Sequence, residues 1–224
     1  MDRAQAKSRR KATARAGRPP KELVADVDER IIGTARELFL ERGLKGVSVE
    51  DIARRARASK GTIYARFPTK EALFTAIAMR NAANVREGFE SNLPLGDGVD
   101  ERLFNLASRI LKHLLADDTV DFIRLAVSEV RSFPDLAKVG RMMRERGAHN
   151  ARNVLEDIAR SNEGGVYPAF AADRLAKTTQ FFLDLIVGPL FMRAVFGEDL
   201  KFLRGQIKNH VKDGVSFFLA ASRT

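Results

Sequence analysis

The chain has 224 residues, of which 45% are hydrophobic, and its 39 Lys and Arg against 29 Asp and Glu give a formal net charge of +10. The absence of cysteine excludes disulfides and thiolate metal sites, and the basic N-terminus, with no apolar core behind it, does not read as a secretory signal. No apolar run approaches the roughly 18 residues of a membrane helix, so we expect a cytoplasmic protein without a membrane partner.

The basic excess is concentrated in the first third of the chain. Residues 1–70 hold 18 Lys and Arg against 9 Asp and Glu, a net of +9, whereas residues 71–224 hold 21 against 20, a net of +1. Positive charge confined to one domain is what binding to a phosphate backbone requires. The alternative is a merely solvated basic face.

Residues 1–25 lack a helical period and carry eight basic residues, so we expect a disordered basic arm. Within it, Arg18 stands between Gly17 and Pro19, a sequence that resembles minor-groove-binding arms. Proline keeps such a backbone extended, and the arginine can enter a narrow A·T-rich groove. A solubilising linker that touches DNA without specificity is the alternative.

A first helix is predicted from about Asp28 to Arg42, because apolar residues recur on one face and Gly43 is placed to end it. By itself this helix is a packing element. It completes a three-helix domain over residues 26–75 and holds the next two helices on the surface. Its apolar stripe consists of Ile31, Ala35, Leu38 and Phe39.

The stretch from Ser48 to Lys70 contains two short helical patterns separated by a tight break. Ser48, with Asp51 three residues later, predicts a capping box at the start of the first helix. In the second helix, Ile63 and Phe67 are inward anchors four residues apart, and the remaining side chains face outward or sideways. Two short helices joined in this way, the second exposed and polar, make a helix-turn-helix.

Eight positions in and after the second helix carry a family signature: Ser59, Gly61, Thr62, Tyr64, Phe67, Lys70, Glu71 and Leu73. Their spacing closely resembles that of the TetR family of bacterial transcriptional regulators, and the resemblance covers about residues 31–77. It implies an all-α fold with an N-terminal homeodomain-like helix-turn-helix domain and a C-terminal helical domain for ligand binding and dimerisation. Family members often have His or another aromatic residue where this chain has Ala65 and Arg66, so no relative's operator can be assumed.

Side-chain chemistry assigns roles within the second helix of the motif. Lys60 and Arg66 can reach phosphates or guanine edges. Ser59 and Thr62 can donate to phosphates, and the methyl group of Thr62 can contact thymine. Gly61 would let the backbone approach DNA, although close packing between helices would also require glycine.

The resemblance makes Tyr64 and Lys70 contacts to the DNA backbone. Tyr64 can equally be a half-buried ring with a wet tip, whereas Lys70 lies at the start of the next helix, where amide groups also favour a phosphate. Arg54, Arg55 and Arg57 are weaker candidates. The predicted DNA-binding residues are Arg18, Ser48, Ser59, Lys60, Gly61, Thr62, Tyr64, Arg66 and Lys70.

Residues 76–224 are predicted to be helical and to form the regulatory and dimerisation domain. A helix that begins at Thr69 connects the two domains. Near the C-terminus, a helix over about 171–196 is apolar on more than one face, and a helix over 200–221 repeats an apolar residue every four positions. The resemblance implies that these two helices form a homodimer, with a purely internal core pair as the alternative. The predicted interface consists of Phe182, Ile186, Leu203, Ile207, Val211, Val215 and Phe218.

The resemblance also implies a small-molecule cavity among the middle helices. Aromatic and methionine side chains are its candidate lining, although such stripes are more often plain core. Few buried polar candidates are visible, so we expect a mostly apolar effector. The candidate lining residues are Phe104, Phe122, Met142, Met143, Phe181, Phe182 and Met192.

An enzyme is the competing class, and the sequence does not favour it. His113, His149 and His210 stand apart without metal-ligand spacing, and no nucleophile elbow, phosphate loop or dinucleotide fingerprint occurs. We therefore predict no catalysis, metal or cofactor. The preferred interpretation is a cytoplasmic, nucleoid-associated repressor that binds a pseudo-palindromic operator as a dimer and is released by a ligand. The alternative is a constitutive architectural DNA-binding protein without an effector.

Overall fold

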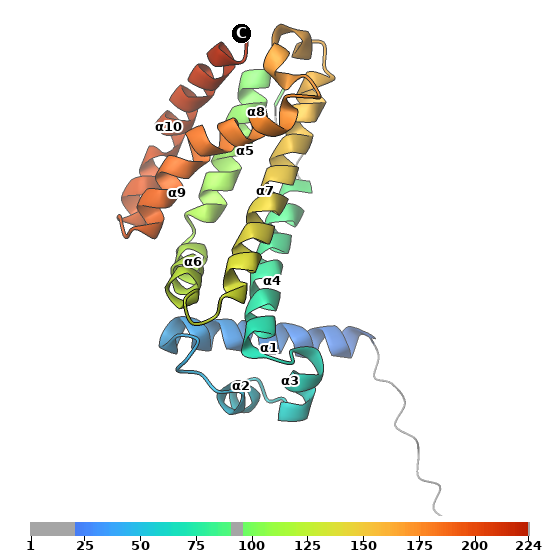
Figure 1. Ribbon diagram of the computed structural model, residues 1–224, viewed down its shortest axis with the longest axis vertical. Helices are drawn as coiled ribbons and strands as arrows, with labels where there is room; N and C mark the ends of the chain where they lie inside the picture. The colour runs from blue at the N-terminus through green and yellow to red at the C-terminus, as the bar shows by residue number, and fades with distance from the viewer. Residues whose placement is uncertain (1–20, 91–95, 224) are drawn as a thin grey trace, which may run out of the picture.

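A computed structural model of the chain describes residues 21–90 and 96–223, and all of its regular structure in these ranges is helical. A small N-terminal helical domain lies at one end of a taller helical bundle (Figure 1). The predicted basic arm, including Arg18, lies almost entirely outside the described residues. In chain order the helices are α1 (Lys21–Arg42), α2 (Val49–Arg55), α3 (Lys60–Arg66), α4 (Lys70–Glu90), α5 (Val99–Leu114), α6 (Asp117–Glu129), α7 (Asp135–Ala159), η1 (Gly164–Val166), η2 (Pro168–Phe170), α8 (Leu175–Phe182), η3 (Leu183–Val187), α9 (Gly188–Val195) and α10 (Leu200–Ala221).

The helices α1, α2 and α3 form the N-terminal domain around the predicted apolar stripe. Ile31, Phe39, Ile52 and Ile63 are each 0% exposed, so the core expected from the periodicity is confirmed. The helix α1 starts at Lys21, earlier than expected, and ends where predicted. At this end Gly43 adopts a φ of 71°, a conformation open to glycine, and its N–H donates to the carbonyl of Phe39 at 2.9 Å.

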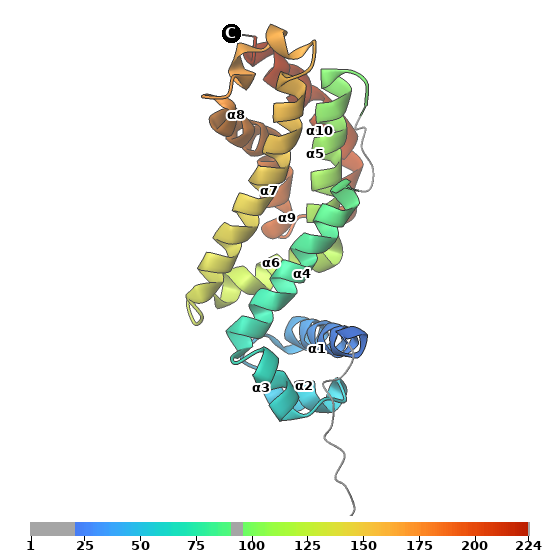
Figure 2. The same ribbon diagram turned by 90° about the vertical axis from the view of Figure 1, so that its right-hand side faces the viewer.

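The two domains share one apolar core at their junction. The rings of Phe74 in α4 and Phe122 in α6 are stacked with centroids 4.3 Å apart, and Leu136 and Val139 of α7 belong to the same cluster of buried residues. The helix α4 passes from this cluster along α7 into the bundle (Figure 2). Because Ile77 is also fully buried in the cluster, the packing of the N-terminal domain continues past residue 75.

The C-terminal domain is a bundle in which α10 packs along α5 and across the α8–η3–α9 segment. This segment is one continuous 21-residue helix, Leu175–Val195, with a π-helical stretch at η3. Gly214 of α10 permits the close approach, because a Cβ there would lie 3.0 Å from the Ile186 side chain. By length and composition alone, with a mean hydropathy of 1.2, the segment could cross a membrane. The sequence had not indicated this, and here Phe182 and Leu190 of the segment are buried in the core of the bundle.

Candidate nucleic-acid interface

The helix α2 begins with the capping box that the sequence predicts. The N–H of Asp51 donates to Ser48 Oγ at 3.1 Å, and the N–H of Ser48 donates to Asp51 Oδ2 at 3.2 Å. The Ser48 hydroxyl also lies 2.6 Å from Asp51 Oδ2, and hydrogen bonding from Ser48 lowers the pKa of Asp51. The Ser48 hydroxyl proton is therefore directed at Asp51, and donation to a phosphate would require it to turn away.

The turn between α2 and α3 is a Schellman motif with an arginine in the position that usually holds glycine. Arg57 has a φ of 49°, the one positive value at a non-glycine position in the described ranges. The N–H of Ala58 donates to the carbonyl of Ala53 at 3.0 Å, and the N–H of Arg57 faces the carbonyl of Arg54 at 3.4 Å. A left-handed backbone at a residue with a Cβ costs about 1 kcal/mol or more. The left-handed backbone therefore costs folding free energy, and it places the exposed Arg57 side chain on the surface of the helix-turn-helix.

Ser59 caps α3 and fixes its first turn. Its Oγ accepts from the N–H of Thr62 at 3.0 Å and lies 2.8 Å from Thr62 Oγ1. Ile63 is fully buried against α1 and α2, which sets the rotation of the helix. Ile63 is the buried residue of α3, whereas Lys60, Gly61 and Tyr64 are exposed.

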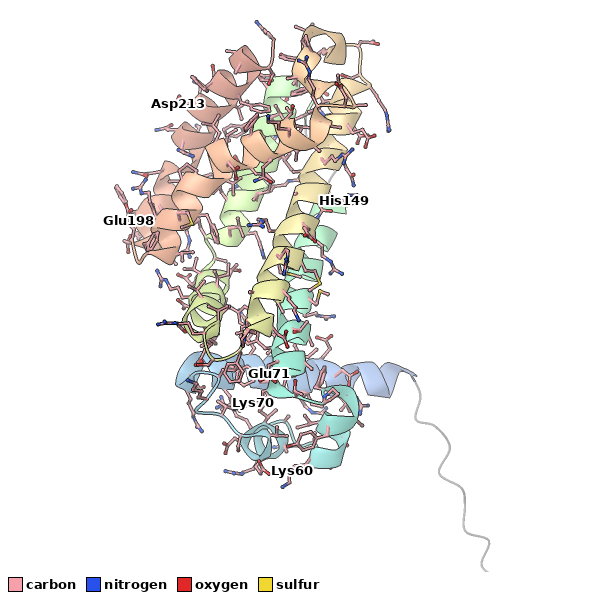
Figure 3. All side chains as sticks on the ribbon, viewed as in Figure 1. Lys60, Lys70, Glu71, His149, Glu198 and Asp213 are labelled. Atoms are coloured by element: carbon pink, nitrogen blue, oxygen red, sulfur yellow. The ribbon has the colours of Figure 1, made fainter. Side chains whose placement is uncertain are left out.

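The outward face of α3 carries one cation and one aromatic ring. Lys60 points away from the body of the protein at the far end of the small domain (Figure 3). Its ammonium lies 2.7 Å from Glu50 Oε1, and the hydrogen bond between them raises the pKa of Lys60 and lowers that of Glu50. Both side chains are exposed, so a phosphate can take the place of Glu50. Tyr64 is 49% exposed beside them.

Gly61 has no neighbour inside the protein that requires a glycine. A Cβ built there would meet only Ser59 Oγ, at 3.7 Å, which is an ordinary contact. Close packing between helices, the alternative explanation of this glycine, therefore has no support in the structure. The other explanation, an approach of DNA to the backbone of α3, stays a prediction.

Two of the predicted DNA-binding cations are instead engaged within the domain. Arg66 forms an ion pair with Asp28 of α1, and its side chain is only 25% exposed. The ammonium of Lys70 donates to the carbonyls of Leu44 at 2.9 Å and Val47 at 3.1 Å, so it closes the connector between α1 and α2. An ammonium has three donors, and Lys70 therefore keeps one for a phosphate, whereas Arg66 would have to leave its ion pair.

The arginines of α2 divide in the same way. Arg55 pairs with Glu37 at 3.2 Å and Glu41 at 3.2 Å, which ties α2 to α1. Arg54 is 78% exposed and makes only a local pair with Asp51 at 3.2 Å. Together with Arg57, Arg54 can extend the positive surface beside α3. Sequence reasoning does not rank Arg57 above its neighbours, because no residue pattern identifies an arginine with a left-handed backbone.

The predicted effector-pocket residues do not line one cavity. Phe122, Met142 and Met143 belong to the domain junction, Phe182 is fully buried in the bundle, and Phe181 and Met192 are exposed. A cavity of about 430 Å³ instead opens between α5 and α10, with Phe104 its one predicted member. Its lining is Phe104, Asn105, Ser108, Lys112, Arg204, Ile207 and Lys208, so three cations stand around an otherwise largely apolar surface.

The predicted dimer-interface residues lie inside the protomer. All seven are at most 5% exposed and belong to the core of the bundle, so none of their surface remains for a second subunit: Phe182, Ile186, Leu203, Ile207, Val211, Val215 and Phe218. The periodicity identified the inward stripe of α10 correctly, but the helix before it is apolar on more than one face, and periodicity did not separate those faces. A second set of large apolar side chains is exposed on α8, η3, α9, α10 and the turn between α9 and α10: Phe181, Leu185, Met192, Phe196, Phe202 and Phe217.

The histidines of the chain are separate from one another. His113 is partly buried, and burial lowers its pKa. His210 lies 2.8 Å from the carbonyl of Ile186, and His149 lies on α7 (Figure 3). Within residues 26–80 and 96–223, no group of three His, Cys, Asp or Glu side chains could hold a metal ion.

Two family models match the chain in adjoining regions. Residues 31–77, which contain α2, α3 and most of α1, match the family described as bacterial regulatory proteins, tetR family. Residues 101–223, more than half of the chain, match the C-terminal domain of AefR-like transcriptional repressors.

Curated relatives are similar over part of their length. The transcriptional repressor NemR of Escherichia coli is 26% identical over 141 residues, which are 62% of this chain and 69% of that protein. YuxN, an uncharacterised regulator of Bacillus subtilis, is 45% identical over 47 residues, 21% of this chain and 16% of YuxN. QacR, a regulator of Staphylococcus aureus, is 36% identical over 52 residues, 23% of this chain and 28% of QacR.

Solved structures resemble the whole described chain. A TetR-family regulator of unproven function from Mesorhizobium loti has a TM-score of 0.76 at 24% identity, and covers 88% of this chain and 97% of its own. The flavonoid-responsive regulator FrrA has a TM-score of 0.69 at 29% identity with the same coverage of both chains. These structures share the two-domain helical architecture seen here.

Proposed function

The chain belongs to the TetR family of bacterial transcriptional regulators, and we propose that it is a repressor that binds a pseudo-palindromic operator as a homodimer and leaves it when a small molecule binds. DNA-binding transcriptional regulation is common to its relatives. The finer parts of the proposal depend on the surfaces described above. We infer no catalytic role, and we place the protein in the cytoplasm, on the nucleoid.

The observation that carries operator binding is the outward face of α3. Gly61 leaves its backbone open to a surface outside the protein, while Lys60 and Tyr64 flank it on the exposed side. A helix of this kind enters the major groove with its N-terminal residues at the base edges. Lys60 would then exchange Glu50 for a phosphate or a guanine, and Arg57 would reach the adjacent backbone.

The second half-site requires a second subunit, and the exposed apolar face of the bundle is the surface for it. On the α8–α9 segment, Phe181, Leu185 and Met192 are spaced by four and seven residues, so they share one face, and Phe196 follows in the turn after α9. Phe202 and Phe217 continue this surface from α10, which lies beside α9 (Figure 1). Soluble monomers seldom expose so many large apolar side chains together. A self-complementary pair of these faces gives a twofold dimer, with half-sites about one helical turn apart or a little more.

Release by an effector requires a structural connection between the bundle and the N-terminal domain that carries α3. The stacked pair Phe74 and Phe122 and the ion pair of Arg36 with Asp118, at 2.9 Å, join α4 and α1 to α6. An effector that binds more tightly to a bundle conformation in which the α3 helices of the two subunits are wrongly spaced for the operator would weaken operator binding. The size of the effect equals the difference in effector affinity between this conformation and the DNA-binding one. One similar structure is that of the flavonoid-responsive regulator FrrA, which supports ligand response as the first hypothesis.

A constitutive architectural protein remains the second candidate, because the basic N-terminal third would serve it equally well. It would bind DNA without strong sequence preference and without an effector. The large C-terminal domain has no purpose in that alternative.

Footprinting on the DNA immediately upstream of the protein's own gene, at defined salt, tests the proposal. Regulators of this family frequently control adjacent promoters. We expect protection over a pseudo-palindrome that persists in excess nonspecific DNA, and a Lys60→Ala variant with weaker protection. Diffuse binding that disappears with modest salt would favour the architectural protein instead.

A further inference from the structure

We propose that the cavity between α5 and α10 binds a small organic anion with a ring or chain as its apolar body. The site deepens the effector part of the proposed function, and only its effect on DNA binding rests on that function. The binding itself is a property of the bundle.

The cavity is large enough for such a ligand and has two apolar walls. Its volume of about 430 Å³ lies in the range of small-molecule sites. Phe104 contributes a ring from α5, and Ile207 contributes an aliphatic side chain from α10. A planar ring between these walls would lose water contact on both faces, which favours a ligand with an apolar body.

A hydroxyl group buried in the wall of the cavity lacks a hydrogen-bond partner. Ser108 is 7% exposed, and within the described part of the chain its Oγ makes no hydrogen bond. The other buried hydroxyls all donate to backbone carbonyls: Thr178 at 2.6 Å, Thr179 at 2.7 Å and Ser222 at 2.8 Å. Buried polar groups are almost always paired, so an unused donor in a cavity wall indicates a missing acceptor.

The cavity lining carries positive charges and no acidic side chain to neutralise them. Lys112 and Lys208 approach the cavity from opposite helices, and neither has an ion-pair partner among the described side chains. No acidic residue lines the cavity. Arg204, the third cation, pairs with Asp117 at 2.8 Å and donates from Nε to the carbonyl of Leu115 at 2.9 Å. A carboxylate between the two lysines, which accepts a hydrogen bond from Ser108, would satisfy all three free groups.

The proposed dimer leaves the cavity open. Lys208 and Phe217 are nine residues apart on α10, which is about 2.5 turns, so their side chains project from opposite sides of the helix. Phe217 belongs to the exposed apolar face, whereas Lys208 lines the cavity. A ligand can therefore reach the site in the assembled regulator.

The site also adjoins the contact between the two domains. Arg204 of the cavity pairs with Asp117, the first residue of α6, and the next residue, Asp118, pairs with Arg36 of α1. A bound anion would compete with Asp117 for Arg204 and loosen the start of α6. Ligand binding would in this way change the contact of α6 with α1, the helix against which α2 and α3 pack.

Binding is tested on the full-length protein with 4-fluorocinnamate and its neutral amide. Because the chain has no tryptophan, fluorine NMR and calorimetry replace intrinsic fluorescence. We expect 4-fluorocinnamate to bind at least about tenfold more tightly than the amide, because only the acid pairs with the lysines. Lys112→Gln and Lys208→Gln should each raise Kd about fivefold. Lys212→Gln, which makes the same charge change on α10 outside the lining, should leave Kd unchanged.

Ser108→Ala provides a second, independent readout. Removal of a buried unpaired hydroxyl should raise the melting temperature and also weaken binding of 4-fluorocinnamate, a combination that a purely structural serine would not give. Equal binding of acid and amide, equal effects of all three lysine variants, or no binding of the acid below about 10 mM would overturn the site. These titrations need no DNA, so a failure here leaves operator binding untouched, and a failed footprint leaves the anion site untouched.

Discussion

Replacement of Gly61 by alanine should separate the stability of the protein from its affinity for DNA. A Cβ at position 61 meets only Ser59 Oγ at 3.7 Å, so no internal clash opposes it. Alanine is favoured over glycine in a helix by about 1 kcal/mol. For a chain of this size that gain corresponds to a rise in melting temperature of about 2–4 °C.

The same methyl group faces the surface that we assign to DNA. It would hold the α3 backbone away from the groove, and a tenfold loss at each half-site is about 1.4 kcal/mol. If the two half-sites contribute additively, a dimer should lose about 2.8 kcal/mol, or roughly a hundredfold, in operator affinity. Nonspecific binding at low salt should change much less, because it depends on phosphate contacts.

Gly147→Ala is the matched control. Gly147 is exposed within α7, and a Cβ there has no neighbour within 4 Å. It should gain similar stability without a change in operator affinity. Thermal unfolding and fluorescence anisotropy with a labelled operator fragment measure both quantities. A Gly61→Ala protein that is more stable and binds the operator with unchanged affinity would refute our assignment of this face to DNA.

Four further substitutions test the remaining surfaces. Arg57→Gly should relieve the left-handed backbone and raise stability by about 1 kcal/mol, yet weaken DNA binding in anisotropy; stronger binding would count against a phosphate contact. Lys70→Ala should cost about 1–2 kcal/mol through the lost hydrogen bonds to Leu44 and Val47 and reduce the salt slope by about 2 per dimer; an intact slope would leave only the structural role. Phe217→Asp should yield folded monomers in light scattering, whereas Val211→Asp, at a fully buried position, should unfold the protomer; a Phe217→Asp dimer would exclude this interface.

The sequence by itself determined the fold class and the helix-turn-helix. Both depend on short-range regularities: the period of Ile31, Ala35 and Leu38, and the cap at Ser48. The end of α1 at Gly43 followed equally from local backbone preference. The family signature added the two-domain architecture, because its spacing is specific to that fold.

Only the tertiary structure decided which side chains remain free. Lys70 and Arg66 read from the sequence as exposed cations, but partners 26 and 38 positions away along the chain engage them. The interface residues named from the sequence lie in the core for a related reason, because the helix before α10 is apolar on more than one face and periodicity does not say which face meets the core.

The cavity between α5 and α10 lay beyond sequence reasoning altogether. Ser108 and Lys208 are 100 residues apart and share no motif. The apolar periodicity of a helix indicates whether a residue faces the core or solvent. It does not indicate which residue of another helix that side chain contacts. The unpaired hydroxyl and the two lysines become one site only when α5 and α10 pack together, because side-chain contacts between helices depend on their relative rotation and distance.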